Sequence, residues 1–177
     1  MDDLIKQLES KSFSGEDIMA VCDNKTKIIT YPQIYQFKNI DDLLKPFDNV
    51  VILYETSPSY GHWVCLLKHK NKGKPYIEFF DSYGMPPDKQ LTFISKEFRK
   101  QNNEAYPILS DMLIKSKYPI KYNDVQLQKL YEDVSSCGRH VAFRIVMQNI
   151  KLGRYIKLLK KSKYPPDMIV TYLTAFQ

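Results

Sequence analysis

The pattern of apolar and polar residues places strands in the middle of the chain. Residues 50–54 form a continuous, largely β-branched apolar run, which is typical of a strand buried on both faces. Further strands are predicted at 62–68 and 76–80, and the Asn-Lys-Gly-Lys segment at 71–74 indicates a hairpin connection between them. The centre of the chain is therefore expected to form a sheet.

Helical patterns precede and follow this centre. Ser14 can cap a helix over 15–22, with Asp17 completing a capping-box-like start. A short strand at 27–31 and a helical turn at 41–44 are predicted next. Beyond the central strands we expect one extended segment, at 118–122, and four helices, at 91–100, 108–115, 137–150 and 167–176.

The composition fits one α+β domain over residues 1–177, with a central mixed sheet flanked by helices. Hydrophobic residues make up 44% of the chain and charged residues 26%, which is a globular composition. No apolar run exceeds five residues, so a membrane-spanning helix is not expected. The chain begins with Met-Asp-Asp, acidic where a secretory signal is basic, so we do not expect export.

The three cysteines favour a reducing, intracellular environment. Cys22, Cys65 and Cys137 are an odd number at unrelated spacings, which fits neither a disulfide framework nor a four-ligand zinc site. His140 lies three residues after Cys137 and could form a metal pair with it, but no further ligand pair has a suitable spacing. We therefore expect no metal site.

Positive charge is concentrated near the C-terminal end. Lys plus Arg total 26 and Asp plus Glu total 20, for a net charge of +6. Residues 151–177 hold six basic residues and one acid, which accounts for +5 of that charge. A helix over 151–163 would present a cationic stripe, either as a solvated face or as a surface for a polyanion such as DNA. The candidate DNA-binding residues are Lys151, Arg154, Lys157, Lys160 and Lys161.

Four short segments offer, in order, the groups that a thiol protease requires. Such an enzyme needs a thiolate nucleophile, a base, an acidic group that orients the base, and donors for the oxyanion. The segments are Gly-His-Trp at 61–63, Phe-Asp-Ser-Tyr-Gly at 80–84, Gln-Leu-Gln at 126–128 and Ser-Ser-Cys-Gly-Arg at 135–139. The combination is more informative than any single segment.

Cys137 is the candidate nucleophile. It is predicted at the first turn of a helix, where the partial positive charge of the helix N-terminus lowers a cysteine pKa. Gly138 would leave the approach to the thiol open, and Ser135 or Ser136 can cap the helix. The alternative is a buried core cysteine, as we expect for Cys22 and Cys65.

His62 is the candidate base, and Asp81 is the group that would orient it. His62 begins a strand, and Asp81 follows the end of the neighbouring hairpin strand on the same face as Ile77 and Phe79. The carboxylate could therefore reach the imidazole from beside it. The alternatives are a core or surface histidine and an ordinary turn aspartate. The remaining candidates are expected to be solvated or to form surface contacts and salt bridges: His69, Arg139 and Arg144.

The order of these motifs resembles the adenain and ubiquitin-like-protein protease superfamily of cysteine peptidases. The chain looks most like the capsid-maturation proteases of large DNA viruses, virophages and Polinton-type elements. The resemblance spans roughly residues 50–150 and rests on four motifs, Gly-His-Trp-Val at 61–64, Phe-Asp-Ser-Tyr-Gly at 80–84, Leu-Gln at 127–128 and Ser-Cys-Gly-Arg at 136–139. It implies a papain-like or adenain-like fold.

The resemblance also implies a catalytic triad of Cys137, His62 and Asp81. It implies an oxyanion hole made by a glutamine side chain and the backbone amide of Cys137. In the family this glutamine usually lies closer to the cysteine, whereas here Gln128 is nine residues before it and Gln126 is eleven. A longer connecting loop would absorb the difference. We prefer Gln128 because it follows a leucine as the motif expects, with Gln126 as the alternative.

The function implied by the resemblance is a cysteine endopeptidase that cleaves viral capsid precursor proteins during virion maturation, after small residues such as glycine. No cofactor is expected to be required, although DNA could stimulate the enzyme as in adenovirus-type relatives. Its partners would be capsid precursors and DNA, without a membrane, in the viral factory of the infected host and in the virion. Two alternatives stay open: an isopeptidase that removes ubiquitin or a ubiquitin-like modifier, and a non-enzymatic nucleic-acid-binding module.

Overall fold

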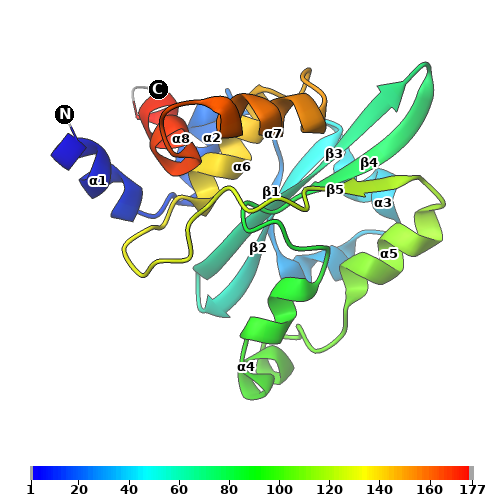
Figure 1. The fold of residues 1–177 in the computed structure, drawn as a ribbon. Coiled ribbons are helices and arrows are strands. Elements are labelled where there is room, and N and C mark those ends of the chain that lie inside the picture. Colours follow the sequence, from blue (N-terminus) through cyan, green and yellow to red (C-terminus); the bar gives the residue numbers. More distant parts are fainter. Residues whose placement is uncertain (1, 176–177) are drawn as a thin grey trace.

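Five strands form one mixed sheet in the computed structural model, which describes residues 2–175 (Figure 1). The strands follow the chain order across the sheet, with parallel pairs at both edges and antiparallel pairs between them. They are β1 (Ile28–Thr30), β2 (Asn49–Ser57), β3 (Tyr60–Asn71), β4 (Lys74–Phe80) and β5 (Ile120–Tyr122). The predicted α+β class with a central mixed sheet is confirmed.

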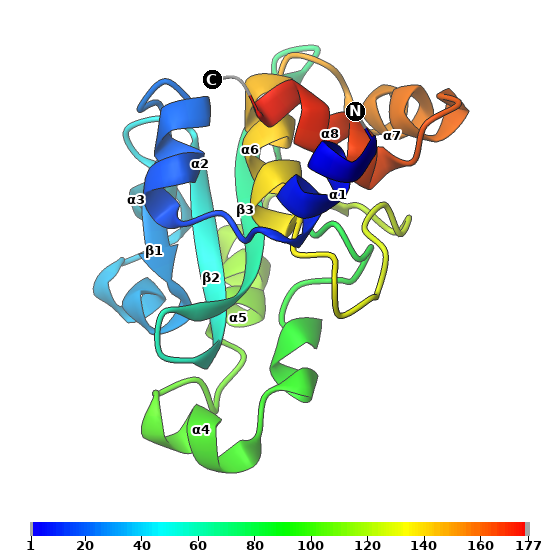
Figure 2. The ribbon, with the colours of Figure 1, turned by 90° about the vertical axis from the view of Figure 1, so that its left-hand side faces the viewer.

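Helices cover both faces of this sheet (Figures 1 and 2). One face carries α2, α6 and α7, with α1 and α8 beside α6, whereas α3 and α5 cover the other face. The helices are α1 (Asp2–Ser10), α2 (Gly15–Val21), α3 (Ile40–Leu44), α4 (Lys96–Gln101), α5 (Ile108–Ser116), α6 (Cys137–Val146), α7 (Leu152–Lys161) and α8 (Pro166–Thr174). Two short 3₁₀ helices, η1 (Tyr31–Gln36) and η2 (Lys89–Phe93), complete the structure.

Strand β2 is buried on both faces, as its uninterrupted apolar run predicts. Val50 and Ile52 point into the core under α3 and α5, whereas Val51 and Leu53 point into the core under α2 and α6. Full burial of a side chain of this size stabilises the fold by about 1.5–3 kcal/mol. The strand therefore contributes side chains to both apolar cores.

Local signals in the sequence account for several element boundaries. The Ser14 hydroxyl accepts the backbone N–H of Asp17, whose carboxylate accepts the backbone N–H of Ser14, so the predicted capping box starts α2. The hairpin between β3 and β4 turns at Lys72 and Gly73, whose φ angles are 49° and 78°. These positive φ angles suit a tight two-residue hairpin turn.

Two predicted helices differ from the structure. The helix expected over 91–100 is instead η2 followed by α4, because Ser95 accepts the backbone N–H of Phe98 and starts a new helix. The helix expected over 137–150 ends at Val146. Beyond that point the buried Arg144 guanidinium donates hydrogen bonds to the carbonyl oxygens of Met147 and Ile150.

The predicted C-terminal helices are present with small shifts. The helix expected over 151–163 is α7, and the one expected over 167–176 is α8, whose predicted last residue, Phe176, lies outside the described residues. Among the described residues, no helix has the length and apolar character needed to cross a membrane.

Candidate active site

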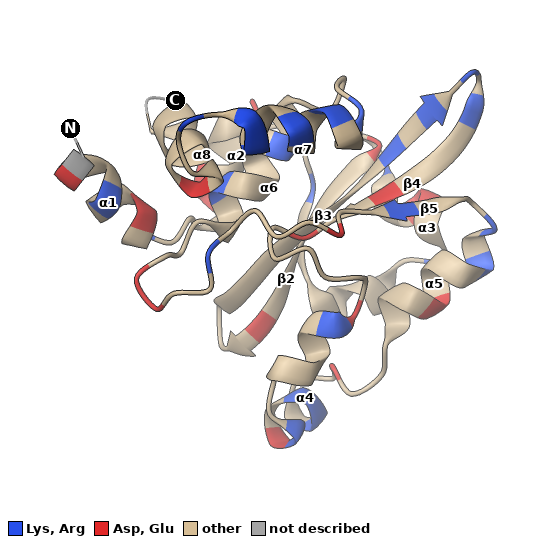
Figure 3. Cartoon of the chain, viewed as in Figure 1, with Lys and Arg blue, Asp and Glu red and all other residues tan. Residues whose placement is uncertain are grey.

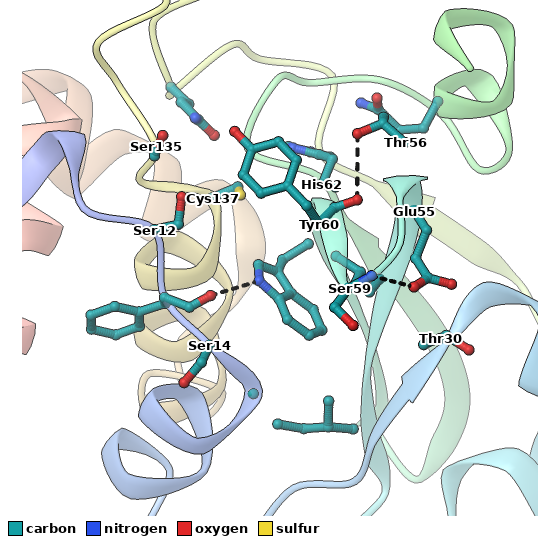
Figure 4. Close-up of a pocket in the computed structure, with 18 of the residues that line it drawn as sticks. Ser12, Ser14, Thr30, Glu55, Thr56, Ser59, Tyr60, His62, Ser135 and Cys137 are labelled. Carbon is teal, nitrogen blue, oxygen red and sulfur yellow. Dashed lines mark hydrogen bonds between the residues drawn. The ribbon is translucent and has the colours of Figure 1, made fainter. Parts of the chain in front are cut away.

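A groove of about 1370 Å³ runs between the start of α2, the β2–β3 turn and the loop that precedes α6 (Figure 4). Its lining includes three of the predicted site residues, His62, Gln128 and Cys137. His62 is contributed by the sheet and Cys137 by the first turn of α6, and both lie in the same part of the groove (Figure 4). The fold thus brings together residues that are far apart in the sequence.

His62 is held at the start of β3 by close packing of the backbone in front of it. A Cβ atom on Gly61 would lie 1.9 Å from the carbonyl oxygen of Tyr54, so only glycine fits at this position. The His62 ring stacks on Tyr83, with ring centroids 4.4 Å apart and an interplanar angle of 12°. Its Nε2 atom lies 2.8 Å from Oδ1 of Asp81, so the carboxylate reaches the imidazole from the neighbouring strand.

Asp81 is fully buried, and both of its carboxylate oxygens are hydrogen-bonded. Oδ1 accepts the backbone N–H of Tyr83 at 2.8 Å in addition to its contact with His62. Oδ2 accepts the side-chain amide of Gln90, which lies in η2, at 2.8 Å. Gln90 is absent from the sequence motifs because only the tertiary fold brings η2 to the end of β4. These contacts hold the carboxylate in one orientation beside the imidazole.

Cys137 is the first residue of α6 and remains partly exposed in the groove. Burial raises the pKa of its thiol, but the hydrogen bond and the charge of His62, together with the backbone amides of Trp63 and Gly138, outweigh burial and lower the pKa below its ordinary value. Because His62 Nε2 faces Asp81, the other ring nitrogen, Nδ1, is the one available to the sulfur. A thiolate is therefore favoured at this position.

The same pairing shifts the histidine in the opposite direction. Burial lowers the pKa of His62, but the negative charge of Asp81 and the hydrogen bonds to Asp81 and Cys137 outweigh burial and raise the pKa to about 10. A raised imidazole pKa and a lowered thiol pKa describe a thiolate–imidazolium pair. Such a pair presents a nucleophile and a proton donor at neutral pH.

Gln128, and not Gln126, is the glutamine that reaches the groove. Gln128 is 1% exposed and lines the groove together with Cys137. Its side-chain carbonyl accepts the hydroxyl of Ser82 at 2.7 Å, which fixes the orientation of its amide group. Gln126 is exposed, and its side-chain amide donates to the backbone carbonyl of Gln128 at 2.9 Å. The structure therefore favours the preferred assignment over the alternative.

The sequence suggested that Gly138 leaves the approach to the thiol open, but in the structure this glycine has a different role. It is buried, and a Cβ atom there would lie 2.6 Å from Cβ of Phe13 and 3.2 Å from the indole of Trp63. The Trp63 indole N–H in turn donates to the carbonyl oxygen of Phe13 at 3.0 Å. Glycine is required here because the segment before α2 packs directly on the first turn of α6.

Behind Cys137 lies a second buried histidine–aspartate pair that the sequence reasoning did not anticipate. Nε2 of His140 is 3.0 Å from Oδ1 of Asp167, a residue in the first turn of α8. Ser136 occupies the N-cap position of α6, but its hydroxyl donates to Asp167 at 2.5 Å instead of capping the helix. Asp167 also accepts the backbone N–H of Lys129 at 3.0 Å.

The other two cysteines lie in the core, as predicted. Cys65 is fully buried, and Cys22 is 5% exposed. Burial raises the pKa of Cys22 to about 12 and that of Cys65 well above its ordinary value. Neither thiol is therefore ionised at neutral pH, whereas the pKa of Cys137 is shifted in the opposite direction.

Three side chains that were expected at the surface or in salt bridges are largely covered. His69 is not solvated, because its Nε2 atom lies 2.9 Å from the buried carboxylate of Glu78. Arg144 forms the expected salt bridge in a fully buried position, with bonds of 2.6 and 2.9 Å to Glu78. Arg139 is 2% exposed and donates to Thr174, so its expected place on the helix surface is wrong.

The basic residues of the predicted cationic stripe lie on and just before α7 (Figure 3). Tyr155 and Leu159 are buried against the domain, which orients the helix. The basic residues on and just before the helix are exposed: Lys151, Arg154, Lys157, Lys160 and Lys161.

The described residues contain no group of three or more potential metal ligands.

A comparison of sequences with known proteins identifies the family of this chain. No model of a known protein family matches the sequence. The chain is 35% identical over 174 residues to uncharacterized protein V9 of Sputnik virophage, and the match covers 96% of this chain and 98% of that protein. The chain belongs to the V9 family. The virophage relative carries no described function, so family membership alone assigns none to this V9-family chain.

Solved structures show that the V9-family chain shares its fold with a viral protease. Two crystal structures of the pS273R protease of African swine fever virus match with TM-scores of 0.53 and 0.54 at 16% and 13% identity. Each match covers 95% of this chain and 68% of that protease. The SUMO protease Ulp1 matches with a TM-score of 0.38 at 13% identity, over 93% of this chain and 79% of that one. The protease fold expected from the sequence is confirmed by the pS273R match.

Proposed function

We propose that this V9-family chain is a cysteine endopeptidase with Cys137 as nucleophile, His62 as base and Asp81 as the group that orients the base. One observation carries the proposal: the three side chains form a continuous hydrogen-bonded series that ends in an open groove. The lowered pKa of Cys137 and the raised pKa of His62 are the shifts that thiol protease chemistry needs.

The mechanism follows from this arrangement. The Cys137 thiolate attacks the scissile carbonyl carbon, and the electron pair of the carbonyl moves to its oxygen. The Gln128 amide and the backbone N–H of Cys137 would hold that oxyanion. His62 then gives its proton to the leaving amine, and the carbon–nitrogen bond breaks. Water, deprotonated by His62, hydrolyses the acyl-enzyme and restores the thiolate.

Viral capsid precursors are the proposed substrates, cleaved after small residues such as glycine. The support is that the relative over nearly the whole chain is a virophage protein and that the fold neighbour pS273R is itself a viral protease. The proposed place of action is the viral factory of the infected host and the maturing virion, without a requirement for a cofactor.

The test is incubation of the purified protein with capsid precursor proteins from the same virus, followed by mass spectrometry of the product termini. Linear and isopeptide-linked fusions to ubiquitin and SUMO are included as competing substrates. Cleavage of the precursor but not of the fusions supports the proposal. Cleavage of the fusions alone would assign the isopeptidase function, and no cleavage of any substrate would leave the protease proposal without support.

Replacing Gln128 by alanine should lower kcat by about 10²–10³ with little change in KM, which is the usual effect of removing one oxyanion donor. The donor acts on charge that develops in the transition state, so substrate binding is spared. Gln126→Ala is the matched control, because this residue is exposed and bonds only the backbone of Gln128. If Gln126→Ala lowered kcat and Gln128→Ala did not, the glutamine assignment would be wrong.

The cationic stripe is proposed to bind DNA and so to concentrate the protease beside its substrates. About four phosphate contacts imply a slope of roughly −3 to −4 when the logarithm of affinity is plotted against that of salt concentration. Fluorescence anisotropy with duplex DNA across a salt series, on wild type and a Lys157→Glu, Lys160→Glu, Lys161→Glu variant, measures this slope. Equal affinity for the two proteins, or a flat salt response, would assign the stripe to solubility alone.

A further inference from the structure

The two proposed oxyanion donors come from separate segments of the chain. Gln128 lies in the irregular segment that follows β5, and Cys137 begins α6. The loop between them, residues 129–136, has an exposed tip, where Leu130 is 61% and Tyr131 is 66% exposed. An exposed loop of this kind contributes little to the register of its own ends, so contacts from outside the loop set the distance between the donors. The carbonyl oxygens of Ser82 and Glu9 accept the backbone N–H groups of Gln128 and Ser135 at 2.9 and 2.8 Å, but each holds one end only.

Asp167 contacts both ends of this loop. Its Oδ2 atom accepts the backbone N–H of Lys129, the residue directly after Gln128, at 3.0 Å. Its Oδ1 atom accepts the hydroxyl of Ser136, the residue directly before Cys137, at 2.5 Å. The same oxygen lies 3.0 Å from Nε2 of His140, one turn further along α6. One carboxylate therefore joins the glutamine segment to the nucleophile helix.

The carboxylate is suited to this task because it is immobile and ionised. Asp167 is 1% exposed and lies in the first turn of α8, which packs beside α6 (Figure 2). Burial raises its pKa, but the hydrogen bonds from His140, Ser136 and the Lys129 amide outweigh burial and keep the pKa below its ordinary value. An ionised acceptor makes stronger hydrogen bonds than a neutral one.

We infer that Asp167 is a positioning residue that assembles the oxyanion hole by clamping both ends of the 129–136 loop. The inference rests on the proposed protease function. It accounts for how this chain accommodates a longer spacing between glutamine and cysteine than its motif predicts. It also gives the C-terminal helix α8, which carries none of the motifs, a role in the reaction.

The test is Asp167→Asn, which keeps the size of the side chain but replaces one of the two acceptor oxygens with an NH2 group that cannot accept a hydrogen bond, so that the side chain can no longer hold both ends of the loop. A shift of the donors by about 1 Å should lower kcat by about 10²-fold. A peptide aldehyde forms a carbon–sulfur bond with Cys137 and places its oxygen at the oxyanion position, so its affinity should fall in parallel. Alkylation of Cys137 by iodoacetamide needs only the thiolate, and its rate should stay within about threefold of wild type.

A double mutant separates positioning from general damage. If Asp167 acts through Gln128, then Asp167→Asn combined with Gln128→Ala should be no more than about threefold worse than Gln128→Ala alone. The matched control is Thr174→Val, which removes the hydrogen bond that Arg139 donates to the other end of α8. This variant should leave the ratio of aldehyde affinity to alkylation rate unchanged. Ser136→Ala, which removes one of the three contacts, provides a milder version if Asp167→Asn folds poorly.

The outcomes are distinct. If the wild type cleaves no substrate, the proposed function itself is contradicted, and the clamp falls with it. A wild type that cleaves, together with Asp167→Asn and Ser136→Ala variants of normal kcat and aldehyde affinity, overturns the clamp. Fully additive losses in the double mutant, or an equal fall in aldehyde affinity and alkylation rate, also overturn it, because Asp167 would then act on the fold or the thiolate.

Discussion

Replacing Cys137 by alanine should abolish cleavage, with a loss of about 10⁶-fold, the order seen when a covalent nucleophile is removed from a protease triad. The expected loss is this large because alanine cannot form the acyl-enzyme, and the His62 and Asp81 side chains have no other nucleophile to act on. Initial rates of capsid-precursor cleavage at saturating enzyme measure the effect. Iodoacetamide should inactivate the wild type with one modified cysteine, at position 137.

The other cysteines provide the controls for this prediction. Cys22→Ala and Cys65→Ala should retain most of the activity, because both thiols are buried in the core with raised pKa values. The two substitutions remove only a small apolar group from a packed site. Retention of cleavage by Cys137→Ala would contradict the cysteine protease assignment outright.

Replacing His62 by alanine should be about as damaging as losing the nucleophile, whereas Asp81→Ala should cost less, about 10⁴-fold. His62 both ionises the thiol and protonates the leaving amine, so its loss removes two steps of the reaction. Asp81 only orients the ring and stabilises its charge. Values of kcat and KM for the three proteins on one precursor substrate measure the ranking.

The pH dependence of alkylation gives an independent readout of the same pair. Because His62 lowers the pKa of Cys137, the wild-type thiolate persists as the pH falls below the ordinary thiol range, and alkylation stays fast at neutral pH. In His62→Ala the thiol pKa rises, and the rate at neutral pH should fall. His69→Ala is the control, since His69 faces Glu78 and not the groove. A harmless His62→Ala beside an inactive His140→Ala would mean that the base was assigned wrongly.

Much of the fold is predictable because its signals are local. The uninterrupted apolar run of β2, the capping box of α2 and the tight turn after β3 each depend on neighbouring residues. The order of His62, Asp81 and Cys137 is also readable, since each stands in a short motif at the end of a strand or the start of a helix. Strand parity places Asp81 on one face with Ile77 and Phe79, but the register that brings it beside His62 comes from the pairing of β3 with β4.

The supporting residues of the site are not predictable in this way. Gln90 and Asp167 stand in no motif, and each reaches the site only through a contact between distant segments. Arg139 is predicted at the helix surface because charged side chains are usually exposed. In the structure it is covered, because α8 packs on α6 and Thr174 accepts a hydrogen bond from it. The surroundings of His69 also depend on a tertiary contact, because its partner, Glu78, lies in the adjacent strand.

The base of the site lies on the sheet, whereas the nucleophile lies on a helix packed against that sheet. The two are joined by apolar contacts between α6 and β3, by the buried salt bridge of Arg144 with Glu78, and by the packing of Phe13 on Gly138. Sub-global opening can separate packed layers at a lower free energy than complete unfolding. We therefore expect the proposed activity to be lost more easily than the secondary structure. Under mild denaturing conditions, loosening of the helical layer should stop the proposed reaction while the five-stranded sheet is still intact.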